Sequence, residues 1–167
     1  DVAKVYLVRK EGKEYALKVL KKPNSFSVFG TEFTLMREFS ILQHLSGIRG
    51  IPHAVFLYTS SPCAEVVTFG AHAFLMEYIP GKPLELSSVS LYTRQRCYEL
   101  LDAIHERNYA IPKFDWKPDN ILLVSAEQGM DPYFIDFFFA ILLSSSTRVR
   151  SQQVADAHLR LVKVLGD

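Results

Sequence analysis

The stretch Lys113–Val124 constrains this chain more than any other, because a polar loop runs there directly into a short apolar segment. The loop holds Asp115, Lys117 and Asn120, and Ile121–Val124 has the pattern of a short buried strand. A carboxylate can orient a hydroxyl proton, an ammonium group can stabilise a phosphoryl group, and an amide oxygen can bind a divalent cation. The simpler alternative is an Asn/Asp/Pro-rich turn before a core strand. The stretch therefore predicts either a phosphoryl-transfer loop or an ordinary turn.

Three other charged residues stand in apolar surroundings elsewhere in the chain. Lys18 lies inside the strand-like run Tyr15–Leu20, Glu38 lies on an apolar helix, and Asp136 ends the apolar strand predicted within Pro132–Phe139. Each of these signals is weak alone. Their order and separation along the chain favour the phosphoryl-transfer interpretation of the loop.

Strand alternation places Lys18 on the same face as Ala16 and Leu20. An ammonium group facing apolar neighbours needs a carboxylate or phosphate partner, and the alternative is a solvated charge on an edge strand. Glu38 lies close to the apolar stripe of its helix, whereas Glu32 lies in the first turn, where the helix dipole explains it. We therefore predict that Glu38 pairs with Lys18.

Together these residues resemble the motifs of the protein kinase family, in the same order and from residue 1 to about Ile141. The matching residues are Lys18 for the lysine of the Val-Ala-Ile-Lys strand, Glu38 for the glutamate of helix C, Asp115, Lys117, Pro118 and Asn120 for the Asp-x-Lys-Pro-x-Asn loop, and Asp136 for the aspartate of Asp-Phe-Gly.

The resemblance implies a two-lobed α+β fold of the protein kinase type. The N-lobe, residues 1–79, would be small and β-rich with one helix, and the partial C-lobe, residues 80–167, would be mainly helical. A strand running into Pro80–Pro83 would mark the hinge between them. The fold would be incomplete at its N-terminus and in its activation segment. The side chains from Lys18 to Asp136 would converge on one cleft between the two lobes.

The resemblance also implies a site for ATP and Mg²⁺. Asp115 would orient the acceptor hydroxyl, and Lys117 would offset charge on the transferred group. The acceptor would be a serine or threonine hydroxyl, because of the lysine two residues after Asp115. The nucleotide and metal contacts would come from Lys18 with Glu38 at the phosphates, Asn120 and Asp136 at Mg²⁺, Val5, Ala16 and Leu122 around adenine, Glu77 and Ile79 at the hinge, and Met76 at the rear of the pocket.

Three departures from the family pattern favour an alternative, a pseudokinase that binds nucleotide or protein partners with little or no catalysis. Lys113 and Phe114 stand where the family has His-Arg, and Phe138 replaces the glycine after Asp-Phe. Ala3 replaces the last glycine of the phosphate-covering loop. No Ala-Pro-Glu motif follows. ATP-dependent transfer to a protein is thus the first hypothesis and a pseudokinase the second.

Composition limits the classes of protein and of binding partner that remain possible. A chain of 167 residues, 49% of them hydrophobic, can bury the core of one domain. Its net charge of +1 predicts no nucleic-acid partner and no membrane surface, and no apolar run is long enough to span a bilayer. Cys63 and Cys97 do not have the spacing of metal ligands, and no signal peptide accompanies them in the sequence. Both observations indicate a cytoplasmic or nuclear protein. The chain begins at Asp1 and is shorter than a full kinase domain, so we expect a fragment or a reduced version of the fold.

Periodicity predicts the other elements. His105 is expected to be partly solvated rather than catalytic. Helices are predicted over residues 31–46, 90–108 and 152–165, and strands over 4–9, 13–21, 54–59, 66–69, 73–79 and 121–124, the first two forming a hairpin.

Overall fold

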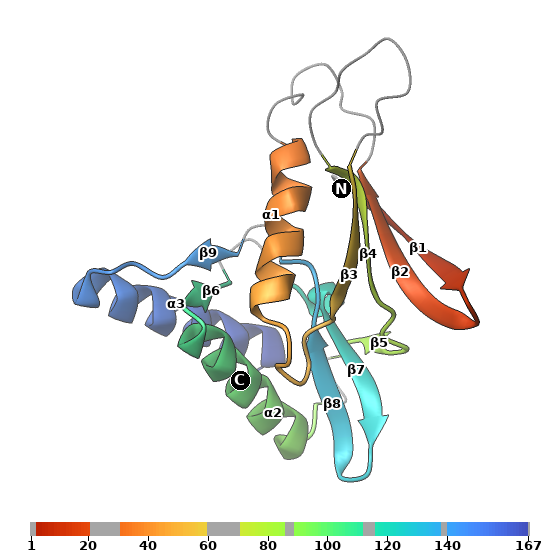
Figure 1. Ribbon diagram of the computed structural model, residues 1–167. Coiled ribbons are helices and arrows are strands. Elements are labelled where there is room, and N and C mark those ends of the chain that lie inside the picture. The colour runs from red at the N-terminus through yellow and green to blue at the C-terminus, as the bar shows by residue number, and fades with distance from the viewer. Residues whose placement is uncertain are drawn as a thin grey trace. The chain divides into compact units, whose positions relative to one another are not determined.

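The computed structural model describes residues 3–20, 31–59, 71–85, 89–111, 116–137 and 140–166. Within these ranges the fold is α+β, with antiparallel sheets and three α-helices (Figure 1), as the sequence predicts. The chain forms two compact units. The first consists of Asp1–Ser46 and Pro52–Tyr78, and the second of Gly47–Ile51 and Ile79–Asp167.

The first unit contains a four-stranded antiparallel sheet in the order β1-β2-β4-β3 (Figure 1). The predicted hairpin is present, and its turn residues Glu11 and Gly12 both have positive φ, 51° and 78°. Two positive φ values at the centre of a two-residue turn match the right-handed twist of the flanking strands. The predicted strand over 66–69 lies outside the described residues. The strands are β1 Ala3–Lys10, β2 Lys13–Leu20, β3 Ala54–Thr59 and β4 Ala71–Glu77.

One helix, α1 Thr31–His44, packs on this sheet, mainly against β4. The rings of Phe39 and Phe74 meet edge to face, with centroids 6.0 Å apart. Gly47 follows with φ 86°, a conformation that stops a helix and suits glycine. The predicted apolar stripe is buried, and it consists of Leu35, Phe39, Leu42 and Leu45.

The second unit combines two small sheets with two helices. Its sheets have the strand orders β5-β7-β8 and β6-β9 (Figure 1). Pro132 lies in β8, an edge strand, so the sheet loses no hydrogen bond although proline has no N–H. The elements are β5 Lys82–Pro83, α2 Leu91–Glu106, β6 Tyr109–Ala110, the 3₁₀ turn η2 Pro118–Asn120, β7 Ile121–Ala126, β8 Gly129–Phe134, β9 Ile141–Leu142 and α3 Thr147–Leu165.

Helix α2 begins where the sequence predicts, with Ser90 as its N-cap. The Ser90 hydroxyl accepts a hydrogen bond from Thr93 N at 3.1 Å. The prediction for His105 is wrong: this residue is only 6% exposed, because α3 packs against α2 at this point. The predicted apolar stripe is buried and comprises Cys97, Leu100, Leu101 and Ile104.

Several element boundaries differ from the sequence prediction by a few residues, among them the start of α3 and the end of β8. Helix α3 starts at Thr147 rather than Gln152, because its first turn is held by hydrogen bonds from Arg150 rather than by apolar burial. Strand β8 ends at Phe134, so Asp136 follows the strand instead of lying at its end. In the described residues, no helix is both long and apolar enough to cross a membrane.

The segment 47–51 is joined to β8 within the second unit. Phe134 N donates a hydrogen bond to Gly50 O at 2.9 Å. Gly50 has φ 99°, and a Cβ added there would lie 2.7 Å from Pro132 O. Both the backbone conformation and the close approach therefore require glycine at this position.

Candidate functional site

The predicted ion pair between Lys18 and Glu38 is present in the first unit. Lys18 Nζ donates to both carboxylate oxygens of Glu38 at 2.8 Å. The two residues are 6% and 1% exposed. The pair therefore joins β2 to α1 in surroundings where neither charge is solvated by bulk water, and each depends on the other.

The sheet face around Lys18 carries three of the predicted adenine-pocket residues. Val5 lies directly opposite Lys18 in the register of β1 and β2, and Ala16 lies opposite Met76 in the register of β2 and β4. Directly paired residues share a face of an antiparallel sheet. Ala16 and Met76 are buried, whereas Val5 is exposed. The face therefore presents an apolar surface beside the lysine.

Each predicted hinge residue makes hydrogen bonds within its own unit. Glu77 N donates to His53 O at 2.8 Å, and the Glu77 carboxylate accepts from His53 N at 3.1 Å. Ile79 is buried, and its carbonyl accepts from Gly81 N at 2.8 Å. These contacts fix the backbone of both residues, and their binding to adenine stays a prediction.

The loop that precedes β7 is described from Trp116 onward, so Asp115 lies outside the described residues. Trp116 Nε1 donates to Ile111 O at 3.0 Å, and its ring meets that of Phe134 edge to face at 5.6 Å. Asn120 N donates to Lys117 O at 3.0 Å, which closes the turn η2. Lys117 is exposed at the start of this turn, and Asn120 is half-buried at its end.

Asp136 is placed next to this loop by a backbone hydrogen bond. Ile135 N donates to Asn120 O at 2.9 Å, immediately beyond the paired residues Ile121 and Phe134 of β7 and β8. Leu122, the predicted floor of the adenine pocket, is half-buried on β7. The predicted metal ligands Asn120 and Asp136 are thus brought together within the second unit, although they are far apart in the sequence.

The backbone of Asp136 is in the left-handed region, with φ 67°. Such values cost a non-glycine residue about 1 kcal/mol or more and gather at functional sites. Of the other non-glycine residues with positive φ in the described part of the chain, Glu11 lies in a hairpin turn and Asn108 follows the end of α2. Asp136 has neither explanation. Its strained backbone marks it as a candidate functional residue.

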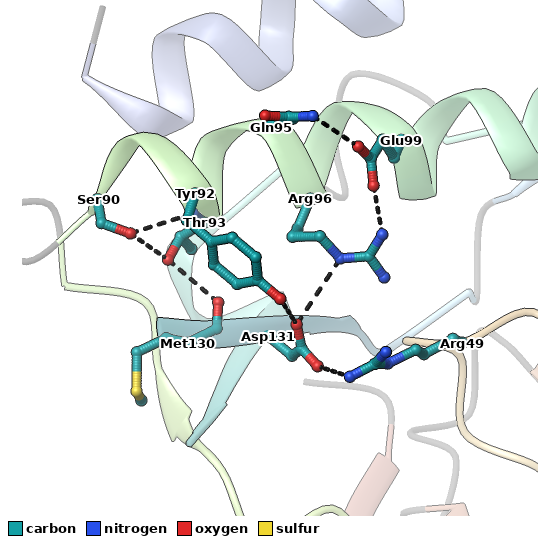
Figure 2. Close-up of polar contacts among 9 residues, drawn as sticks. All are labelled: Arg49, Ser90, Tyr92, Thr93, Gln95, Arg96, Glu99, Met130 and Asp131. Atoms are coloured by element: carbon teal, nitrogen blue, oxygen red, sulfur yellow. Dashed lines mark hydrogen bonds and ion pairs between the residues drawn. The ribbon is translucent and has the colours of Figure 1, made fainter. Parts of the chain in front are cut away.

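A second buried carboxylate, Asp131 on β8, was not predicted from the sequence (Figure 2). It accepts a hydrogen bond from Tyr92 Oη at 2.8 Å, binds Arg49, and lies 3.7 Å from Arg96 Nε. Arg96 also pairs with Glu99. The Asp131 hydrogen bond, with burial and the Asp131 charge next, raises the pKa of Tyr92 above its usual value.

This Asp131 cluster joins α2, β8 and segment 47–51 within the second unit. Thr93 on α2 adds a hydrogen bond from its hydroxyl to Met130 O at 3.1 Å (Figure 2). Among the described residues the partners of the carboxylate are Tyr92, Arg49 and Arg96, which tie three segments together in the manner of a structural anchor. No local pattern in the sequence marks Asp131, and only its neighbours in space reveal it.

Comparison with known proteins agrees with the kinase motifs. The chain is 34% identical over 125 residues to the serine/threonine-protein kinase PEPKR2 of Arabidopsis thaliana. It is similar to a serine/threonine protein kinase. The alignment covers 71% of this chain but only 23% of the plant kinase, so the chain spans about a quarter of that protein's length. No protein-family model matches the chain.

Proposed function

We propose that this chain is an ATP-dependent phosphotransferase that transfers the γ-phosphate to a serine or threonine hydroxyl of a protein. The observation that carries the proposal is the buried ion pair between Lys18 and Glu38, with both bonds at 2.8 Å. Apolar residues often fill such a space at equal or better stability, so burial alone does not account for the pair. Holding an ammonium group ready for nucleotide phosphates does account for it.

The proposed phosphate and metal contacts follow the motif assignments. Lys18, oriented by Glu38, would bind the α- and β-phosphates, and Asn120 and Asp136 would bind Mg²⁺. Bound Mg²⁺ would offset negative charge on the phosphates. The hydrogen bond from Ile135 to Asn120 and the strained Asp136 backbone support this metal assignment. Asp115 would orient the acceptor hydroxyl and Lys117 would stabilise the developing charge.

The nucleotide base would contact Val5, Ala16 and Leu122. The backbone of Glu77 and Ile79 would bind its edge, and Met76 would line the rear of the pocket. Under this proposal residues 1–79 and 80–167 are the two lobes of a kinase-like fold, and the protein acts in the cytoplasm or nucleus.

The second candidate function is that of a pseudokinase, which binds nucleotide or a protein partner without transferring phosphate. The sequence favours it at three positions: Lys113 and Phe114 replace His-Arg, and Phe138 replaces the glycine after Asp-Phe. Because phenylalanine does not share the backbone freedom of glycine, Phe138 would limit movement of Asp136.

Thermal unfolding with ATP and Mg²⁺ tests the nucleotide site. Ligand at about 100 times its dissociation constant should stabilise the protein by about 2.7 kcal/mol. Asp136→Asn should remove the part of the stabilisation that depends on Mg²⁺, whereas Asp119→Asn, an exposed carboxylate next to Asn120, should leave it unchanged. No stabilisation of the wild-type protein by ATP contradicts a nucleotide site.

Phosphate transfer to a protein separates the two candidates. Asp115→Asn should keep the ATP-induced stabilisation and lower the transfer rate by at least about 100-fold, because proton transfer in the transition state is lost. Equal rates for wild type and Asp115→Asn would indicate a contaminating kinase. ATP binding without transfer above that background would leave the pseudokinase.

A further inference from the structure

A cluster of three potential metal ligands lies between α2 and α3 and shares no residue with the proposed phosphotransfer site. Asp102 and His105 are three residues apart on α2, and His158 comes from α3. One ligand atom from each residue lies within 4.8 Å of the other two. His158 Nε2 and Asp102 Oδ1 are 3.0 Å apart. Residues at i and i+3 of a helix project from the same face, a spacing that metal sites in helical bundles use.

His105 is the unusual member of this cluster. Its side chain is buried, at 6% exposure, and neither Nδ1 nor Nε2 has a hydrogen-bond partner among the residues that the structure describes. Buried polar atoms are almost always satisfied in native proteins, so two unsatisfied nitrogens on one buried ring are available to a ligand. An imidazole binds metal ions in its neutral form through a ring nitrogen.

The surroundings hold the second histidine in place and leave the cluster accessible. The ring of Tyr98 is stacked on His158, with centroids 6.1 Å apart and planes at 11°. Arg150 on α3 donates to His105 O at 3.4 Å, which fixes the end of α2 against α3. Asp102 is exposed and His158 half-buried, so an ion can enter from solvent.

We propose that Asp102, His105 and His158 bind a divalent transition metal ion of the zinc class. Two imidazoles and one carboxylate suit Zn²⁺, with water as a fourth ligand, better than the all-oxygen preference of Mg²⁺. Ligand bonds of about 2.1 Å require ligand atoms about 3.4 Å apart, so the side chains must close in by rotation around the ion. The ion would cross-link α2 to α3.

Binding of Co²⁺ and Zn²⁺ to metal-free protein tests this proposal. Co²⁺ should give the visible absorption bands of a four- or five-coordinate ion at one equivalent, and Zn²⁺ should displace it and raise the unfolding temperature. Millimolar Mg²⁺ should do neither. A wild-type protein that gives no visible band, or one whose unfolding temperature is unchanged by Zn²⁺, overturns the proposal.

Two pairs of variants locate the binding. Asp102→Asn and His158→Gln keep the size of accessible side chains and should each weaken Zn²⁺ binding by more than about 10-fold. Glu106→Gln, an exposed carboxylate beside His105, and His44→Gln, an exposed histidine on α1, should bind Zn²⁺ as the wild type does. Wild-type affinity in both ligand variants would overturn the proposal, even if ATP binding is intact.

Discussion

Each unit of this molecule contains a buried carboxylate, and the two are stabilised differently. Glu38 in the first unit is bound by Lys18, which is itself buried. Asp131 in the second unit is bound by Tyr92 and by arginines that reach solvent, since the side chain of Arg49 is 68% exposed. A buried carboxylate can therefore have two different roles in this molecule. The Asp131 cluster is an anchor that joins elements of one unit, whereas the Lys18–Glu38 pair holds an ammonium group inside the fold.

Breaking the pair in the first unit should have the largest effect. Lys18→Met leaves the Glu38 carboxylate buried without its cation and should lower the free energy of unfolding by about 3 to 5 kcal/mol. The double variant Lys18→Met/Glu38→Leu should recover most of that loss, because apolar side chains can fill the space. Urea unfolding of both variants and of Lys13→Met, an exposed lysine on the same strand, measures these differences.

A double variant as unstable as the single one would contradict this view of the pair. The same double variant should fail to bind ATP even though it is folded. Stability and nucleotide binding would then depend on different properties of the same two residues.

Removing the charge of Asp131 should have a smaller effect. Asp131→Asn keeps an acceptor for Tyr92, and Arg49 can be solvated by water, so the free energy of unfolding should fall by about 1 to 3 kcal/mol. Urea unfolding measures the loss, with Glu127→Gln in the β7–β8 turn as an exposed control. A loss of stability as large as that of Lys18→Met would contradict the view that the two buried carboxylates are stabilised differently.

The smallest effect concerns the thiol of Cys97, next to Arg96 on α2. Burial raises the pKa of Cys97 to about 12, so almost none of it is thiolate at pH 8. In a Cys63→Ser background, iodoacetamide should therefore label the native protein very slowly at pH 8, and faster as the pH rises toward 12. Asp131→Asn should speed labelling modestly by loosening α2. Mass spectrometry measures the rate, and rapid labelling at pH 8 would show that α2 is not held as described.

Local periodicity was sufficient to predict the elements whose apolar stripe is buried. The β1–β2 hairpin, the stripe of α1 and that of α2 all follow spacing within a few residues. The Lys18–Glu38 pair was predicted for a related reason, since each charge stands at an apolar position of its own element. Where buried positions recur regularly along an element, the sequence alone predicts the element and its buried residues.

Contacts between distant residues could not be predicted in this way. Asp131 meets partners 39 and 82 residues away, and no local pattern marks it. The burial of His105 depends on α3, which the sequence around His105 does not reveal, so partial solvation was expected there. Helix α3 begins earlier than its apolar pattern because Arg150 binds the end of α2. These features arise when elements pack together.

The left-handed backbone of Asp136 has an evolutionary consequence. Glycine adopts φ 67° without steric cost, so replacement of Asp136 by glycine would relieve about 1 kcal/mol of conformational strain while deleting the carboxylate. Selection for a durable scaffold would favour that exchange, and selection for metal chemistry would oppose it. Which residue a descendant of this gene carries at position 136 thus records the pressure under which its lineage has evolved.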